Sequence, residues 1–206
     1  MTINKLRAGF RYFQETSFQK QTELYRSLVK NGQNPHSIVI ACSDSRLSPA
    51  IMFNTAPGEI FVVRNIANIV PPYVADTGFH GTNAAIEFAV CELSVSNIIV
   101  LGHSNCGGVH RMCEDSKQRS DREFIDTWLS SANYVVNSDL QGVELYKHVE
   151  REMIINSTNN LLTFPWLKTK FDKGDLEIHG WFFDLESGKL FSKSDRDDWL
   201  AVDSDE

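Results

Sequence analysis

Three short apolar runs, each followed by a segment of helical character, constrain this chain more than any other feature of its sequence. They cover residues 37–42, 60–64 and 97–102, and they are rich in Ile and Val. Continuous β-branched runs of this length are typical of strands that are buried on both faces of a parallel sheet. Because strands that alternate with helices join through helical crossovers, the sequence predicts an α/β fold with a mainly parallel sheet and flanking helices.

The segments around these runs carry signals for helices and for one hairpin. The turn signal Glu186-Ser-Gly188 lies between two further strand candidates, 177–184 and 189–192, and predicts a C-terminal hairpin. A short helix is expected after the cap signal Ser48-Pro49, and another helix is expected to run from the capping box Ser120-x-x-Glu123 toward Asn137. The Ala-rich stretch 84–95 should form a buried helix, and a further helix should cover about 141–156.

The two ends of the chain differ from the segment between them. Residues 1–32 place apolar side chains three and four positions apart, which predicts helices without an obvious place in one sheet sandwich. We expect them to form an arm that docks on a partner subunit. Residues 194–206 hold six acids and one Arg, and they are expected to form a solvated, mobile acidic tail. With no composition break between the ends, residues 1–206 are expected to form one domain.

Composition excludes two classes of partner. The 206-residue chain has a formal net charge of -7, whereas a face that binds nucleic acid should be basic. No apolar run approaches the roughly 18 residues of a membrane span, and the N-terminus lacks the apolar core of a secretory signal. We therefore expect a cytoplasmic protein that binds neither nucleic acid nor membrane, with its four cysteines as thiols or metal ligands.

Two clusters of chemically active residues follow the first and third apolar runs. Residues 42–46 read Cys-Ser-Asp-Ser-Arg, and residues 103–108 read His-Ser-Asn-Cys-Gly-Gly. The carboxyl ends of parallel strands form the binding crevice of a doubly wound sheet, so both clusters are expected to meet there. The two thiolates and one imidazole of Cys42, His103 and Cys106 suit Zn²⁺ and leave a fourth position open, the mark of a catalytic zinc.

An Asp–Arg pair accompanies the first of these cysteines. Asp44 lies two residues after Cys42, and Arg46 lies two residues after Asp44. An Arg–carboxylate pair is a strong, oriented hydrogen-bonded unit, and it can hold one carboxylate oxygen toward a water on the metal. Zn²⁺ with two thiolates is formally neutral and should acidify its bound water less than an all-histidine site does. A carboxylate acceptor beside the metal would therefore help to orient the hydroxide.

The remaining cysteines and histidines have no spacing typical of a ligand. Cys91, inside the apolar helical stretch, and Cys113 are expected to be structural. The other histidines are expected to be structural or surface residues, and the sequence does not indicate which of them relays protons, if any does: His36, His80, His110, His148 and His179.

Four segments resemble the signatures of beta-class carbonic anhydrases: 41–46, 57–68, 102–108 and 178–181, the last followed by Asp184 and Gly188. The resemblance runs from about residue 24 to residue 192. It implies reversible, zinc-dependent hydration of carbon dioxide to bicarbonate and a proton by hydroxide on the zinc ion. The residues that match the family's zinc ligands are Cys42, His103 and Cys106, and those that match its catalytic pair are Asp44 and Arg46.

The resemblance also implies a substrate pocket and an assembly. It suggests a four-stranded, mainly parallel sheet with a fifth strand near the dimer contact, and a homodimer whose N-terminal helices embrace the partner subunit. Dimers can pair further into tetramers or larger assemblies, and some pocket residues would serve the neighbouring subunit's zinc. Phe88 replaces a tyrosine of plant-like members. The matching pocket positions are Gln33, Phe61, Ile66, Phe88 and Gly107.

Two alternatives to carbon dioxide hydration remain at this point. A sister enzyme on the same scaffold would hydrolyse carbon disulfide or carbonyl sulfide. A non-catalytic, zinc-stabilised interaction protein would need a closed fourth ligand or a damaged Asp–Arg pair, and the intact Asp44 and Arg46 argue against it.

Some bacterial members of the family carry an inhibitory bicarbonate pocket, formed by Trp, Arg and Tyr. The matching positions here are Val39, Arg64 and Phe183, and two of them have lost the hydrogen-bond donor. The sequence therefore predicts the open form of the site, with Asp44 paired to Arg46.

Overall fold

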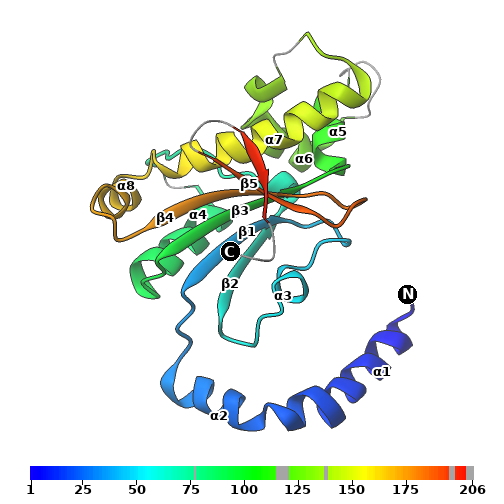
Figure 1. Ribbon diagram of the computed structural model, residues 1–206, viewed down its shortest axis with the longest axis vertical. Helices are drawn as coiled ribbons and strands as arrows, with labels where there is room; N and C mark the ends of the chain where they lie inside the picture. The colour runs from blue at the N-terminus through cyan, green and yellow to red at the C-terminus, as the bar shows by residue number, and fades with distance from the viewer. Residues whose placement is uncertain (77, 115–120, 137–138, 195–197, 203–206) are drawn as a thin grey trace.

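A six-stranded sheet in the order β2-β1-β3-β4-β5-β6 runs through the middle of the chain's computed structural model (Figure 1). The first four strands in this order are mutually parallel, and β5 and β6 are antiparallel additions. The mainly parallel four-stranded sheet and its C-terminal hairpin strand are therefore confirmed. The strands are β1 (Ser37–Cys42), β2 (Ile60–Asn65), β3 (Asn97–His103), β4 (Glu177–Phe183), β5 (Leu190–Lys193) and β6 (Trp199–Ala201).

The structure describes the chain except residues 77, 115–120, 137–138, 195–197 and 203–206. In the described part, no helix is both long and apolar enough to cross a membrane. The α-helices are α1 (Ile3–Phe13), α2 (Thr22–Asn31), α3 (Pro49–Met52), α4 (Gly81–Glu87), α5 (Gly107–Cys113), α6 (Glu123–Ser130), α7 (Gly142–Leu161) and α8 (Pro165–Asp172).

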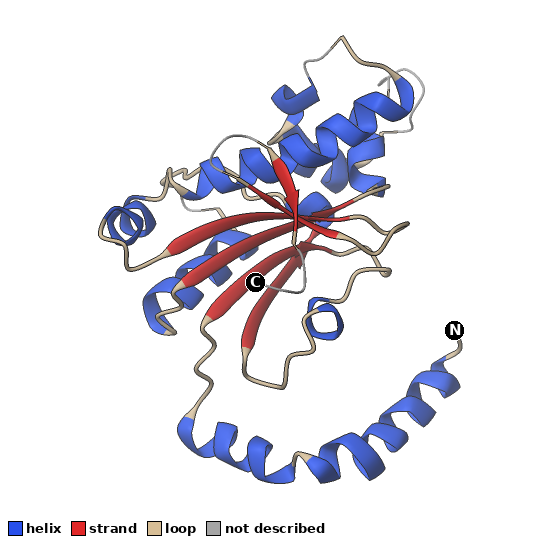
Figure 2. Cartoon of the chain, in the orientation of Figure 1, coloured by secondary structure: helices blue, strands red, loops and turns tan. Residues whose placement is uncertain are grey.

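Helices cover both faces of the parallel strands (Figure 2). Alternate residues of a strand point to opposite faces, so Ile38 and Ile40 belong to one apolar core and Val39 and Ala41 to another. The first core includes side chains of α4 and α8, the second those of α5 and α6, and α7 contributes to both. This double burial explains why the apolar run of β1 is continuous rather than alternating.

The N-terminal arm, residues 1–32, curves away from the sheet at the blue end of the chain (Figure 1). It consists of α1, a π-helical turn at Gln14–Phe18, and α2. Neither α1 nor α2 has a buried residue. The arm meets the body where Leu28 packs on Gly58. The approach is so close that a Cβ at Gly58 would lie 2.7 Å from Leu28 Cδ2. Its exposed large apolar side chains are Met1, Ile3, Leu6, Phe10, Tyr12, Phe18 and Val29.

Two segments that the sequence predicts as buried are exposed on one side. Strand β2 is the edge of the sheet, and Val62 is 38% exposed because, among the described residues, no strand pairs with the outer edge of β2. The stretch 84–95 forms α4 and a π-helical turn, Phe88–Glu92, with only one face packed on the core. Phe88 and Cys91 lie on the other face and are exposed, so the expectation that this helix is buried is wrong at Cys91.

Several predicted boundaries also change. Strand β6 lies inside the predicted acidic tail, where Trp199–Ala201 pairs with β5, so that part is not a free end. The helix α7 continues past residue 156 to Leu161. The helix predicted to follow the Ser120-x-x-Glu123 capping box toward Asn137 is observed as α6, which begins at Glu123 and ends at Ser130, and a 3-10 turn, Asn133–Val136, follows it. Ser120 and Asn137 lie outside the described residues.

Candidate metal centre

Two neighbouring strand ends bring a Cys, a His and a second Cys together. Strand β1 ends at Cys42 and β3 at His103, and the two strands are paired in parallel. Cys106 follows β3 as the N-cap residue of α5. One ligand atom from each of the three residues lies within 4.8 Å of the other two, and the two Sγ atoms are 3.8 Å apart. The site therefore lies at the carboxyl ends of the strands, where ligands bind in open α/β sheets.

The imidazole of His103 is oriented for a metal. Its Nδ1 lies 2.9 Å from the carbonyl oxygen of Ser104, and because that oxygen only accepts, Nδ1 carries the proton. The lone pair is then on Nε2, which is buried and has no hydrogen-bond partner among the described residues. An unpaired buried acceptor is costly, so a cation at this position fits the ring.

The two thiols fit the same cation. The pKa of Cys42 is lowered to about 4, chiefly because the Cys106 thiol donates a hydrogen bond to its sulfur. The pKa of Cys106 is raised by the neighbouring Cys42 thiolate and by burial. The pair thus keeps one proton until a cation neutralises both sulfurs. Two thiolates and a neutral imidazole are a donor set that suits Zn²⁺ and leaves a fourth position open.

Asp44 and Arg46 form a bidentate ion pair at the edge of this cluster. Arg46 Nε donates to Asp44 Oδ1 at 2.9 Å, and Arg46 Nη2 donates to Oδ2 at 2.6 Å. These hydrogen bonds hold the pKa of Asp44 well below its usual range. Asp44 Oδ2 is 3.9 Å from His103 Nε2. An ionised acceptor therefore lies beside the position that a metal ligated by Nε2 would occupy.

Arg64, one of the three positions of the bicarbonate pocket, braces the loop that carries Asp44. It donates to the carbonyl oxygens of Cys42 at 3.1 Å, Asp44 at 2.7 Å and Leu47 at 2.8 Å. Val39 is fully buried in the core. In this structure Arg64 therefore holds the main chain on the Asp44 side of the metal cluster.

Two of the five predicted pocket residues lie beside the cysteines. Ile66 and Gly107 line a cavity of about 340 Å³ together with Cys42 and Asp44. The other three lie elsewhere in this chain. Gln33 is exposed between the arm and β1, and the rings of Phe61 and Phe88 face each other with centroids 6.0 Å apart.

Helix α6 supplies side chains that the sequence analysis missed. Ile125 lines the cavity beside Cys42, and Trp128 Nε1 donates to the carbonyl oxygen of Ile66 at 2.9 Å. Asp126 accepts two hydrogen bonds from Arg111, each 2.9 Å long, which join α6 to α5. Ile125 and Trp128 lie three residues apart, and this apolar spacing is the sequence signal for a helix face that packs on the rest of the chain.

A fourth missed residue is Glu150 on α7. It is 3% exposed, and its Oε1 accepts a 3.0 Å hydrogen bond from the backbone N–H of Cys106. Burial raises the pKa of Glu150, and this hydrogen bond opposes the shift. The sequence signal was a charged residue at helical spacing from Met153 and Ile154, which belong to the buried face of α7.

Known proteins of one family match nearly the whole chain. The profile of a family described as carbonic anhydrase matches residues 37–190. Beta carbonic anhydrase 3 of Arabidopsis thaliana is 36% identical over 194 residues, which are 90% of this chain and 74% of that protein. A carbonic anhydrase of Synechococcus elongatus is 32% identical over 204 residues, which are 95% of this chain and 74% of that protein.

Solved structures of the same class superpose on this fold. The beta-carbonic anhydrase CcaA has a TM-score of 0.91 and 31% sequence identity, with 98% of this chain and 93% of that chain covered. A beta-carbonic anhydrase of Sordaria macrospora, described as tetrameric, has a TM-score of 0.80 and 28% identity over 92% of this chain and 95% of that chain. With its Cys-His-Cys cluster at the strand ends, this chain belongs to the beta class of the carbonic anhydrase family, whose members catalyse the zinc-dependent hydration of carbon dioxide.

Proposed function

We propose that Cys42, His103 and Cys106 hold the zinc ion of this carbonic anhydrase and that Asp44 and Arg46 form its catalytic pair. The observation that carries the proposal is the convergence of three ligand atoms within 4.8 Å of one another, with the Nε2 of His103 otherwise unpartnered among the described residues. Three protein ligands suit a catalytic rather than a closed structural zinc.

The residues around the metal position have separable tasks. When bound, zinc acts as a Lewis acid and makes water nucleophilic near neutral pH. Asp44 stays ionised and acts as a hydrogen-bond acceptor that orients the attacking water. Arg46 occupies both carboxylate oxygens, so it fixes the direction of Asp44 and keeps that carboxylate paired rather than free to become a fourth ligand.

The cavity beside the cysteines suits a small substrate of low polarity. Ile66 and Ile125 provide apolar walls, and Gly107 leaves the main chain uncovered at the metal side. Gly108 allows the close approach of this loop to Ile66, because a Cβ at Gly108 would lie 2.7 Å from Ile66 Cγ2. Carbon dioxide can therefore lie against these apolar walls, next to the metal position.

The active assembly that we propose is a homodimer, in which Gln33, Phe61 and Phe88 serve the partner subunit's site. The exposed apolar arm supports this assembly, and so does the outer edge of β2, which has no strand partner in the part of the chain that the structure describes. Both leave apolar side chains in solvent in a single chain. Pairing of dimers into tetramers remains part of the proposal.

We expect the double variant Leu6→Glu/Phe10→Glu to sediment as a monomer at micromolar concentration and to lose most of its activity. Both side chains lie on one face of α1 and are 55% and 59% exposed within the chain, so charge there disturbs an interface and not the core. Ala8→Glu, on the opposite face of α1, is the matched control and should keep the parental assembly. A monomer with full activity would contradict the role of the arm.

Bicarbonate is expected to inhibit this enzyme without cooperativity. Val39 and Phe183 carry no side-chain donor, and Arg64 already donates to three main-chain carbonyls. A ligand shifts a two-state site only through differential contacts, and the anion would find few here. Initial rates measured against bicarbonate concentration near pH 7 should follow a simple hyperbola. Sigmoidal inhibition, with Asp44 bound to zinc in crystals grown at that pH, would overturn this expectation.

A cytoplasmic location is the final part of the proposal. None of the four cysteines forms a disulfide, and thiolate ligands persist most readily where the compartment is reducing. Fractionation of the source cells, with the activity followed in each fraction, would test the location.

Stopped-flow hydration of carbon dioxide, combined with metal analysis of the same sample, tests the reaction. One zinc per chain and rapid hydration are expected. Turnover of carbon disulfide or carbonyl sulfide should be slow by comparison, and faster turnover of either gas would favour the sister hydrolase. Zinc without turnover of any of the three gases would favour the interaction protein.

A further inference from the structure

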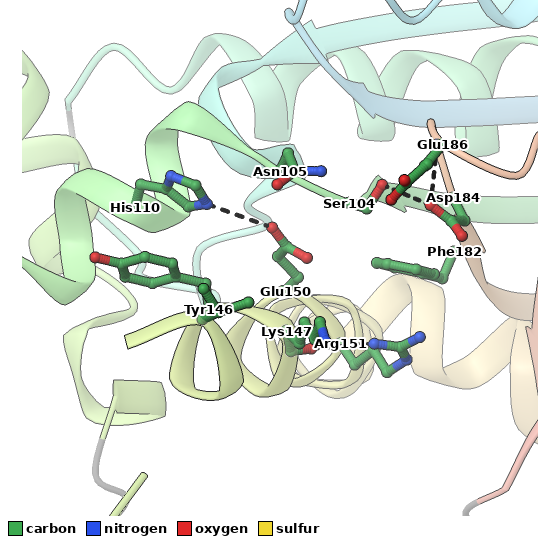
Figure 3. A pocket seen from close by; sticks show the side chains of 11 residues that line it. Ser104, Asn105, His110, Tyr146, Lys147, Glu150, Arg151, Phe182, Asp184 and Glu186 are labelled. Carbon is green, nitrogen blue, oxygen red and sulfur yellow. Dashed lines mark hydrogen bonds and ion pairs between the residues drawn. The ribbon is translucent and has the colours of Figure 1, made fainter. Parts of the chain in front are cut away.

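A buried acid lies beneath the loop that carries Cys106. Figure 3 shows Glu150 pointing from α7 toward Asn105, with His110 and Tyr146 to one side. Its Oε1 accepts the N–H of Cys106 at 3.0 Å, and the backbone of the neighbouring Asn105 helps to lower the pKa of Glu150 against the effect of burial. An acid this deeply buried is costly to keep unless its oxygens are paired. Cys106 and Asn105 both belong to the loop between His103 and α5.

That loop contains a conformation that needs support. Asn105 has φ 55°, in the left-handed region that residues other than glycine adopt infrequently. Its carbonyl oxygen accepts a 2.9 Å hydrogen bond from Arg46 Nη2. The turn is therefore held on one side by the guanidinium that pairs with Asp44 and on the other side by Glu150.

The approach of α7 to the loop depends on a glycine of β3. A Cβ at Gly102 would lie 2.6 Å from Ile154 Cδ1, one helical turn after Glu150. Absence of that Cβ lets α7 lie close enough for a Glu side chain to reach the backbone of Cys106. The contact is thus built into the packing of α7 on β3, rather than made by a mobile surface side chain.

We propose that Glu150 is a positioning residue, whose carboxylate holds the Asn105–Cys106 turn so that Cys106 Sγ faces Cys42 and the Asn105 carbonyl meets Arg46. The proposal rests on the zinc ligands proposed above. Glu150 touches neither the metal position nor the substrate cavity, and it acts through Cys106 and Arg46. Outer residues of this kind orient metal ligands, and their loss typically weakens metal binding by about 10- to 100-fold.

The side chains around Glu150 make a conservative test feasible. His110 Nε2 is 3.9 Å from Oε1, and the His110 ring stacks on Tyr146 with centroids 4.2 Å apart. These residues line a cavity of about 380 Å³ that opens beside the carboxylate. Glu150→Gln keeps the size of the side chain and one acceptor oxygen, but it replaces the second oxygen with a donor. The hydrogen bond from the Cys106 N–H then goes to a neutral amide oxygen and is weaker than the bond to a carboxylate.

The experiment measures how firmly the folded holoenzyme keeps its zinc. Glu150→Gln should lose zinc to a competing chelator at about one tenth of the chelator concentration that the parent requires, or less. Glu150→Asp keeps the charge but is one methylene shorter, and it should weaken zinc retention as well. Glu186→Gln is the matched control, because Glu186 lines the same cavity and is exposed. Zinc retention in this control should equal that of the parent.

Two further readouts separate positioning from support of the fold. In the cobalt-substituted protein, the thiolate-to-metal absorption band of Glu150→Gln should shift relative to the parent. The kcat for carbon dioxide should fall while KM changes by less than about twofold, since Arg46 and Cys106 move but the pocket walls do not. Far-UV circular dichroism of each variant reports whether the fold is kept.

Each outcome decides the matter. Parental zinc retention and an unchanged cobalt band in folded Glu150→Gln would overturn the inference, and so would loss of the fold in both Glu150 variants, which would make the residue part of the scaffold. A parent without zinc or hydration activity would instead refute the proposed function.

Discussion

Replacing Cys106 with Ser is expected to remove most of the zinc and nearly all of the carbon dioxide hydration activity. A serine hydroxyl remains protonated where a thiol becomes a thiolate, and only Cys42 and His103 would remain as ligands. Two ligands cannot fix the tetrahedral geometry that leaves one position open. The buried hydroxyl would also face Cys42 Sγ, which lies 3.8 Å from the present Cys106 Sγ.

Zinc content per chain and stopped-flow hydration rates, measured on the same preparation, check this prediction. Cys113→Ser is the matched control, because Cys113 ends the helix that begins beside Cys106. Burial raises the pKa of Cys113 to about 11, so it stays a thiol and its substitution should leave zinc content unchanged. Full zinc content and a parental rate in Cys106→Ser would mean that the metal has a different ligand set.

The central strands could be predicted because their burial leaves a local pattern in the sequence. Strands β1 and β3 are covered on both faces, which produces uninterrupted Ile and Val runs. Strand β2 carries a similar run but lies at an edge, and a run of apolar residues does not say which strand has a neighbour on each side. Strand β6 has only three residues and is flanked by acidic residues, so it is too short to show the alternation of apolar and polar residues that marks a strand.

The metal cluster could be predicted because strand ends fix where its residues lie. Cys42 and His103 are the last residues of paired parallel strands, so topology alone brings them together. Glu150 is different, because its partner is the backbone N–H of a residue 44 positions earlier. Backbone groups leave no trace in the residue pattern, and only the packing of α7 on Gly102 creates that contact.

Asp44→Asn is expected to keep the fold and at least part of the zinc, yet to lower the hydration rate by about 10²-fold or more, the scale of general acid–base contributions. Asn offers a neutral amide where the parent has an ionised acceptor paired with Arg46 at 2.9 and 2.6 Å. Arg46 donates to both oxygens of Asp44, so the amide nitrogen of Asn faces an Arg46 N–H in either orientation, and in one of them it also turns a donor toward the attacking water. The three zinc ligands are untouched by the change.

The pH dependence of stability gives this variant a second signature. Because Arg46 lowers the pKa of Asp44 in the folded chain, the ionised pair stabilises the fold above the unfolded pKa of about 3.9. That stabilisation disappears as the pH falls through the lower, folded pKa. Urea unfolding should therefore show the parent more stable than Asp44→Asn near pH 7, with the difference closing below about pH 4.

Asp172→Asn is the control for removal of a carboxylate, since Asp172 forms an exposed pair with Lys168 on α8. Its hydration rate should equal that of the parent, and its stability should change little, because an exposed ion pair contributes little to the free energy of unfolding. The decisive comparison is the rate per bound zinc. If Asp44→Asn matched the parent on that scale while losing stability near pH 7, the Asp44–Arg46 pair would only brace the loop after β1. A rate loss per zinc in Asp44→Asn alone instead assigns the orientation of the attacking water to the Asp44 carboxylate.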